Sequence, residues 1–122
     1  MAKILIIEDE KLLAEMYKEK FSQAGFVVVA APEAEEGLET AKKERPDLII
    51  LDILLPKADG ISFLQRLREE PDLASIPVVA FSNFDDPETK KSAFRLGVKD
   101  YLIKTNYTPL ELTEKIKTYL TK

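Results

Sequence analysis

The chain lacks cysteine and histidine, and it has neither a long hydrophobic run nor a run of basic residues. Without cysteine, disulfide bonds and thiol catalysis are excluded, and without histidine as well the common zinc sites and imidazole catalysis are excluded. The first apolar stretch is only a few residues long and leads into acidic residues, so it predicts neither a signal peptide nor a membrane span. We therefore expect a cytoplasmic protein with no membrane association.

The remaining composition is that of an ordinary globular protein. Of the 122 residues, 45% are hydrophobic and 33% are charged, and this length suits one domain over residues 1–122 with a single core. Lysine and arginine number 18, and aspartate and glutamate number 22, which gives a formal net charge of −4. A negative charge disfavours direct binding to nucleic acid.

Short apolar runs alternate with amphipathic helical patterns along the whole chain. The runs predict five strands, at residues 4–7, 27–29, 48–51, 77–81 and 101–103. Apolar residues spaced by three and four positions predict a helix after each strand. This alternation predicts an α/β fold in which a parallel sheet carries helices on both faces.

Residues that favour helix ends mark several of the predicted boundaries. Gly25 and Gly97 are suited to the position that follows a helix, and Pro32 is suited to open the second helix. Asp86-Pro87 predicts the start of the fourth helix. The segment Thr108–Glu111 has the spacing of a capping box and predicts the start of the fifth.

Polar residues follow four of the five predicted strands. In open α/β sheets, ligands bind outside the carboxyl ends of the strands, so these side chains define the expected site. They are Glu8 and Asp9 after the first strand, Asp52 after the third, Ser82 after the fourth and Lys104 after the fifth.

This set of side chains predicts a site for a hard cation and a phosphoryl group. Asp9 and Asp52, with a backbone carbonyl and waters, offer the oxygen ligands that Mg²⁺ prefers. An ionised Asp52 can also accept a phosphoryl group as an acyl phosphate. Phosphoryl transfer requires that charge on the phosphoryl oxygens be neutralised, and Mg²⁺, Lys104 and the Ser82 hydroxyl can supply this.

In this order and spacing, the motifs resemble the receiver domain of two-component response regulators, in the CheY-like superfamily, and the resemblance covers the whole chain. The separations from Asp52 to Ser82 (82 − 52 = 30) and to Lys104 (104 − 52 = 52) are typical of that family. The resemblance implies a flavodoxin-like, doubly wound parallel sheet of five strands in the order 2-1-3-4-5, with five helices. The matching motifs are Glu8-Asp9, Asp52-Ile53-Leu54-Leu55-Pro56, Asp59-Gly60, Ser82 and Tyr101-Leu102-Ile103-Lys104.

The resemblance also implies a metal site and a phosphoacceptor. Asp52 would accept the phosphoryl group, and Mg²⁺, with Mn²⁺ as an alternative ion, would be held by Asp9, by Asp52, by Glu8 through water and by the main-chain carbonyl of Leu54. The chain would catalyse its own phosphorylation and dephosphorylation at Asp52. It would therefore be a signalling switch and not a turnover enzyme.

The implied donor is a phosphohistidine on a sensor histidine kinase or a histidine phosphotransfer protein. Ser82 and Lys104 would bind the phosphoryl group, and Tyr101 would be the aromatic switch that turns inward behind it. The change would reach a surface formed by the fourth helix, the fifth strand and the fifth helix. A chain of 122 residues leaves no room for an output domain unless it is a fragment, so we expect output through a protein partner. We expect a monomer, or a homodimer that depends on phosphorylation.

Two positions depart from the usual pattern of the family. Thr105 stands where a proline with a cis peptide normally follows the lysine, and a cis bond without proline costs ~3–4 kcal/mol, so we expect the Lys104–Thr105 peptide to be trans or strained. Asn83 stands where alanine or glycine is usual, and we expect it to cover part of the acceptor pocket. With the apolar Phe84 and Leu54 at the mouth of this pocket, Asn83 predicts a long-lived phosphorylated state.

Three rival functions differ in how well they fit the motifs. A haloacid-dehalogenase-like phosphatase would need an acid where the chain has Leu54. A flavodoxin-like FMN binder would need a phosphate loop where Glu8-Asp9-Glu10 would repel phosphate. The third is a receiver-like module that binds proteins independently of phosphorylation. Asn83 and Thr105 leave this third alternative open.

Overall fold

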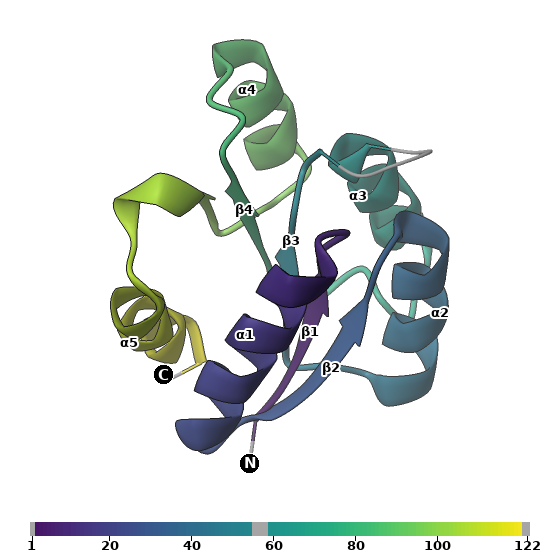
Figure 1. Ribbon diagram of the computed structural model, residues 1–122. Coiled ribbons are helices and arrows are strands. Elements are labelled where there is room, and N and C mark those ends of the chain that lie inside the picture. The colour runs from purple at the N-terminus through teal and green to yellow at the C-terminus, as the bar shows by residue number, and fades with distance from the viewer. Residues whose placement is uncertain (1, 55–58, 121–122) are drawn as a thin grey trace.

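A parallel sheet of five strands forms the centre of the computed structural model, which describes residues 2–54 and 59–120 (Figure 1). The strand order is β2-β1-β3-β4-β5, which confirms the predicted topology. Leu55 and Pro56 of the predicted motif lie outside the described residues. The strands are β1 (Lys3–Ile7), β2 (Val27–Ala31), β3 (Leu48–Leu51), β4 (Val78–Ser82) and β5 (Asp100–Ile103).

Helices cover both faces of the sheet (Figure 1). One face carries α1 (Lys11–Gln23) and α5 (Pro109–Leu120). The other carries α2 (Ala34–Glu44), α3 (Gly60–Glu69) and α4 (Pro87–Arg95). A short 3-10 helix, η1 (Lys104–Asn106), joins β5 to the segment before α5 and was not expected from the apolar pattern. Among the described residues, no helix is both long and apolar enough to span a membrane.

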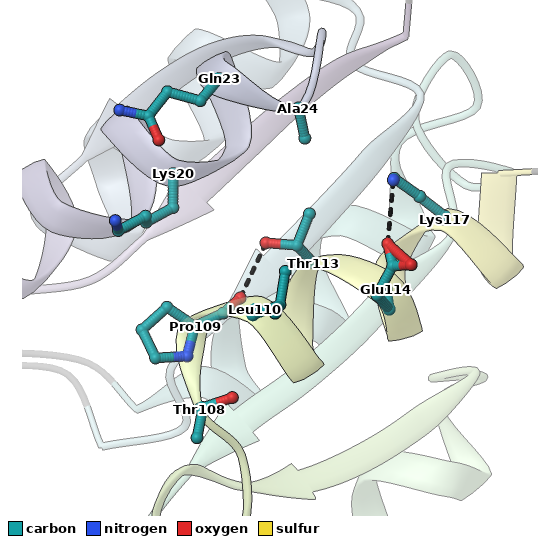
Figure 2. Close-up of a pocket in the computed structure, with 9 residues that line it drawn as sticks. All are labelled: Lys20, Gln23, Ala24, Thr108, Pro109, Leu110, Thr113, Glu114 and Lys117. Carbon is teal, nitrogen blue, oxygen red and sulfur yellow. Dashed lines mark hydrogen bonds and ion pairs between the residues drawn. The ribbon is translucent and has the colours of Figure 1, made fainter.

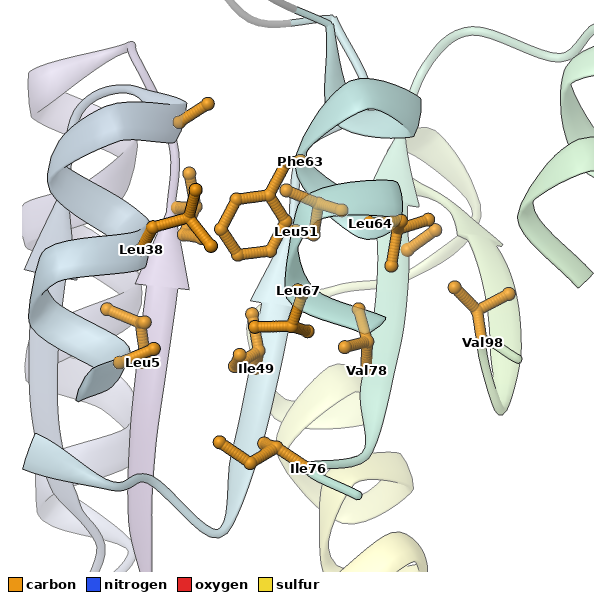
Figure 3. Packing of buried hydrophobic residues seen from close by; sticks show 14 of the residues in the cluster. Leu5, Leu38, Ile49, Leu51, Phe63, Leu64, Leu67, Ile76, Val78 and Val98 are labelled. Atoms are coloured by element: carbon orange, nitrogen blue, oxygen red, sulfur yellow. The ribbon is translucent and has the colours of Figure 1, made fainter. Parts of the chain in front are cut away.

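The core is divided into two layers because alternate residues of a strand point to opposite faces. In β1, Leu5 and Ile7 pack on the side of α2 and α3, whereas Ile4 and Ile6 pack on the side of α1 and α5. Figure 3 shows the first of these layers, in which Phe63 of α3 lies among apolar side chains of the sheet and α2. The strands are therefore apolar on both sides, as expected for a buried parallel sheet.

Helix ends agree with the predicted caps except at α2. Gly25 and Gly97 follow α1 and α4 with φ angles of 99° and 87°, a conformation that glycine adopts without strain. The Asp86 side chain accepts a hydrogen bond from the N–H of Thr89 at 2.9 Å. The predicted start of α2 at Pro32 is wrong by two residues. Glu33 has an extended backbone, with φ of −151°, so the helix cannot begin before Ala34.

The capping box at the start of α5 is confirmed. Thr108 N–H donates to the Glu111 carboxylate at 2.9 Å, and Glu111 N–H donates to the Thr108 hydroxyl at 3.1 Å. Two backbone N–H groups at the start of the helix thus receive acceptors. This cap fixes the start of α5, and it therefore sets the end of the short segment between β5 and α5, which contains Lys104.

Candidate functional site

Three carboxylates meet at the carboxyl edge of the sheet. Glu8 and Asp9 follow β1, and Asp52 follows β3, which is paired with β1 so that Ile7 lies beside Leu51. One oxygen from each carboxylate lies within 4.8 Å of the others. Glu8 and Asp52 are only 4% and 7% exposed, whereas Asp9 is exposed. The predicted convergence of these acids is confirmed, and two of them are held away from bulk water.

Lys104 connects the two buried carboxylates. Its ammonium donates to Glu8 Oε1 at 2.6 Å and to Asp52 Oδ2 at 3.1 Å, and its side chain is 10% exposed. Because β4 separates β5 from β3 in the sheet, the lysine reaches across one strand to Asp52 and across two to Glu8. The ammonium thus offsets one of the three negative charges at this edge.

Each buried carboxylate also accepts a backbone hydrogen bond. Glu10 N–H donates to Glu8 Oε2 at 3.2 Å, and Leu54 N–H donates to Asp52 Oδ1 at 3.1 Å. Both carboxylates therefore have one oxygen on the backbone and the other on Lys104. This pattern fixes the orientation of both groups, which is the condition for presenting an oxygen to a reacting atom.

Burial and charge act on the ionisation of this cluster in opposite directions. Burial raises the pKa of Glu8 to about 7, against the lowering effect of Lys104. Burial alone would lower the pKa of Lys104, but the hydrogen bond to Glu8 and the charge of Asp52 outweigh it and raise the value. Lys104 therefore stays charged, and a cation at this edge would favour the ionised form of Glu8.

The oxygen atoms of the cluster fit a hard divalent cation. Mg²⁺ and Mn²⁺ prefer carboxylate, carbonyl and water oxygens, and three carboxylates supply such donors here. Asp9, which is exposed and is not in contact with Lys104, is the most accessible of the three. The carbonyl of Leu54 stays a predicted ligand. The Leu54 side chain is 53% exposed beside Asp52.

Ser82 ends β4, and Tyr101 is the second residue of β5. Ser82 is the last residue of β4 and is buried, and its hydroxyl accepts a hydrogen bond from Phe84 N–H at 3.1 Å. Tyr101 points inward, and its hydroxyl donates to the Phe84 carbonyl at 2.6 Å. Burial, with the charge of Asp52, raises the pKa of Tyr101 to about 12, and the Lys90 ammonium lies 5.8 Å from its ring.

Asn83 and Thr105 contact each other, which the sequence did not predict. The Asn83 side-chain oxygen accepts a hydrogen bond from Thr105 N–H at 3.1 Å. Residues 2–54 and 59–120 contain no cis peptide, so the Lys104–Thr105 peptide is trans, as expected for a residue other than proline. The sequence did contain one indication of this contact, because both residues that depart from the family pattern come just after the ends of neighbouring strands, β4 and β5. The effect of Asn83 and of the exposed Phe84 on access to Asp52 stays a prediction.

Two pockets help to delimit the site. One of about 570 Å³ lies between α1 and α5 and includes no residue of the carboxylate cluster (Figure 2). The other, of about 330 Å³, is bordered by Glu8 and Asp9 and by Lys11 and Lys18 of α1. Of these two pockets, the second adjoins the predicted chemistry, and it leaves the exposed side of Asp9 open to solvent.

Comparison with known proteins agrees with this geometry. The response regulator receiver domain family matches residues 4–117. The probable transcriptional regulator ycf27 of Porphyridium aerugineum is 34% identical over 118 residues, which cover 97% of this chain and 48% of that protein. This chain thus spans about half the length of ycf27 and of similar curated regulators.

Solved structures show the same fold over nearly the whole chain. The receiver domain of Francisella response regulator 1452 has a TM-score of 0.85 and 30% identity, and the alignment covers 97% of this chain and 95% of that one. A CheY-like receiver domain protein from Methanospirillum hungatei JF-1 has a TM-score of 0.91 and 26% identity, with coverage of 98% and 94%. The chain belongs to the response regulator receiver domain family.

Proposed function

We propose that this receiver domain accepts a phosphoryl group on Asp52 and works as a signalling switch. The observation that carries the proposal is the position of Lys104, whose ammonium contacts Asp52 at 3.1 Å in a cluster with Glu8 and Asp9. A cation held against an aspartate at the edge of the sheet stabilises incoming negative charge. The same contacts would be of little use to a surface that only packs against a partner.

The reaction that fits the site is transfer from a phosphohistidine of a partner kinase or phosphotransfer protein. A carboxylate oxygen of Asp52 attacks phosphorus, the P–N bond of the donor breaks, and its electron pair returns to the imidazole. The leaving imidazole carries a proton on its other ring nitrogen, so the products are an acyl phosphate on Asp52 and a neutral histidine on the partner. Because these 122 residues contain no histidine, the phosphohistidine donor lies outside them.

Asp9, Asp52, Glu8 and the carbonyl of Leu54 are the groups that would hold Mg²⁺ at this edge. When bound, the ion supplies positive charge that offsets the phosphoryl oxygens. Lys104, which follows β5, supplies a second positive charge in contact with Glu8 and Asp52. Leu54 N–H keeps Asp52 oriented through its bond to Oδ1, at 3.1 Å.

The switch would act by a shift between two populations. A phosphoryl group on Asp52 can bond to the Ser82 hydroxyl and to Lys104, and these bonds exist only in the phosphorylated protein. Ser82 already contacts Phe84, whose carbonyl holds Tyr101, so movement of Ser82 reaches the loop between β4 and α4. We propose that a protein partner or a second copy of the chain reads the surface formed by α4, β5 and α5 in the cytoplasm.

Intact-mass measurement tests the proposal directly. The protein is incubated with Mg²⁺ and a small acyl phosphate, and separately with a phosphohistidine protein. The parent is expected to gain one phosphoryl group, and Asp52→Ala is expected to gain none. The matched control is Asp72→Asn, which removes an exposed carboxylate outside the cluster and should react like the parent. No gain with either donor would refute the proposal and favour a module that binds independently of phosphorylation.

A further inference from the structure

The two residues that depart from the family pattern form a hydrogen bond that the usual residues could not form. Asn83 supplies the acceptor oxygen, and Thr105 supplies the backbone N–H, at a distance of 3.1 Å. Proline at position 105 would have no N–H to donate. Alanine or glycine at position 83 would have no side-chain acceptor. The bond therefore requires both departures together, so the two positions are best considered as one unit.

We propose that Asn83 is a positioning residue for Lys104 and acts through the backbone N–H of Thr105. This inference rests on the proposed function, in which Lys104 binds the phosphoryl group. The backbone before Lys104 is fixed because Ile103 pairs with Ser82 between β5 and β4. The backbone after Lys104 is fixed by the bond from Thr105 to Asn83. The lysine is thus held on both sides by the end of β4.

Tyr107 packs against the core directly after the turn that contains Lys104, but the backbone of the turn itself has little other hydrogen bonding. The residue before η1, Ile103, has no side chain that could cap the turn, and the internal bond from Tyr107 N–H to the Lys104 carbonyl is long, at 3.3 Å. The first N–H groups of a helical turn lack partners within the turn. Asn83 supplies such a partner from another loop. Its removal would loosen the backbone from which Lys104 reaches Asp52.

Positioning and steric cover predict opposite effects of Asn83 on the reaction. If the side chain mainly covers the pocket, its removal admits the donor more easily and phosphorylation becomes faster. If it holds Lys104, its removal weakens the alignment of the ammonium with Asp52 and phosphorylation becomes slower. A net hydrogen bond of ~1 kcal/mol corresponds to about a fivefold change in rate. The sign of the effect therefore separates the two roles.

The first test observes Lys104 without any phosphoryl donor. In NMR spectra recorded with a chelator, Asn83→Ala should shift the ammonium signal of Lys104 and speed hydrogen exchange at the Thr105 amide about fivefold. Asn83→Asp retains an acceptor oxygen and should restore protection of that amide. Asn106→Ala is the matched control, because Asn106 is exposed in η1 and its side chain makes no hydrogen bond to the described residues. An unchanged Lys104 signal in Asn83→Ala would overturn the inference.

The second test measures the rate at which Asp52 is phosphorylated by a saturating acyl phosphate with Mg²⁺. Asn83→Ala should slow this rate about fivefold, and it should have no further effect in Thr105→Pro, which already lacks the N–H donor. A faster reaction, or the same slowing in both backgrounds, would overturn the inference. If the parent gains no phosphoryl group, the proposed function fails, whereas the NMR comparison still decides whether Asn83 positions Lys104.

Discussion

Replacing Lys104 with methionine should destabilise the metal-free protein, because the lysine holds two buried acids together. The ammonium contacts Glu8 at 2.6 Å and Asp52 at 3.1 Å, and all three side chains are at most 10% exposed. Removing one partner of a buried ion pair costs ~3–5 kcal/mol. Both acids keep a backbone hydrogen bond, so the lower end of this range, about 3 kcal/mol, applies.

This loss can be measured by thermal unfolding in a chelator, followed by circular dichroism. For a domain of this size, 1 kcal/mol corresponds to roughly 3–4 °C, so Tm should fall by about 10 °C in Lys104→Met. Lys99→Met is the matched control. Lys99 is exposed, its side chain makes no ion pair with the described residues, and its loss should leave Tm almost unchanged.

Mg²⁺ should then stabilise Lys104→Met more than the parent. Ligand at about 100 times Kd adds ~2.7 kcal/mol of stability to any folded state that binds it. In the parent, Lys104 already occupies one oxygen of Glu8 and one of Asp52, whereas in the variant both oxygens are free and the cluster is one charge more negative. An equal or smaller rise of Tm in the variant would refute the idea that lysine and metal compete for the same carboxylates.

Two further predictions concern the tyrosine and the glycine beside the acceptor. Burial raises the pKa of Tyr101 to about 12 from an ordinary value of 10.0. As the pH rises, this tyrosine therefore ionises in the unfolded chain before it ionises in the folded protein. The stability that the buried tyrosine contributes is complete below pH 10 and is lost as the pH rises to 12. Denaturant unfolding at several pH values should show this loss in the parent and a smaller one in Tyr101→Phe; identical profiles would contradict it. A Cβ at Gly60 would lie 2.7 Å from the backbone of Ile53 and 3.1 Å from the carbonyl of Asp52, so Gly60→Ala should cost ~1–3 kcal/mol and slow phosphorylation. Denaturant unfolding measures the stability of Gly60→Ala, and intact-mass kinetics measures its phosphorylation rate. If both equal those of the parent, the predicted clash with Ile53 and Asp52 is contradicted.

The fold could be predicted because its determinants are local. Apolar runs gave the five strands, and the glycines and capping residues gave most helix ends. The start of α2 was predicted two residues too early. Pro32 favours the first turn of a helix, and its presence does not indicate that the backbone of Glu33 is extended. The 3-10 turn at Lys104 is too short to produce a periodic apolar pattern. Elements that depend on loop conformation were therefore the ones that spacing alone could not predict.

The candidate site could be predicted as a set of residues but not as a set of contacts. Strand order brings Glu8, Asp9 and Asp52 to one edge. The pattern of strands predicted the parallel sheet, and the resemblance to receiver domains implied the order. The Lys104 ammonium lies closer to Glu8 than to Asp52, and this difference depends on the path of the lysine side chain across β4. Such distances are set by burial and competing charges, which a sequence of residue types does not encode locally.

The charge of the cluster explains why Lys104 would be the first group to respond to phosphorylation. Three carboxylates and one ammonium leave two net negative charges, which a divalent cation can neutralise. In the proposed function, transfer to Asp52 would convert one of its carboxylate oxygens into part of an acyl phosphate, and new negative charge would appear on the phosphoryl oxygens. The ammonium would then be attracted to that charge as well as to Glu8. Because Thr105 is bonded to Asn83, a movement of the lysine would reach the loop after β4 together with that of Ser82.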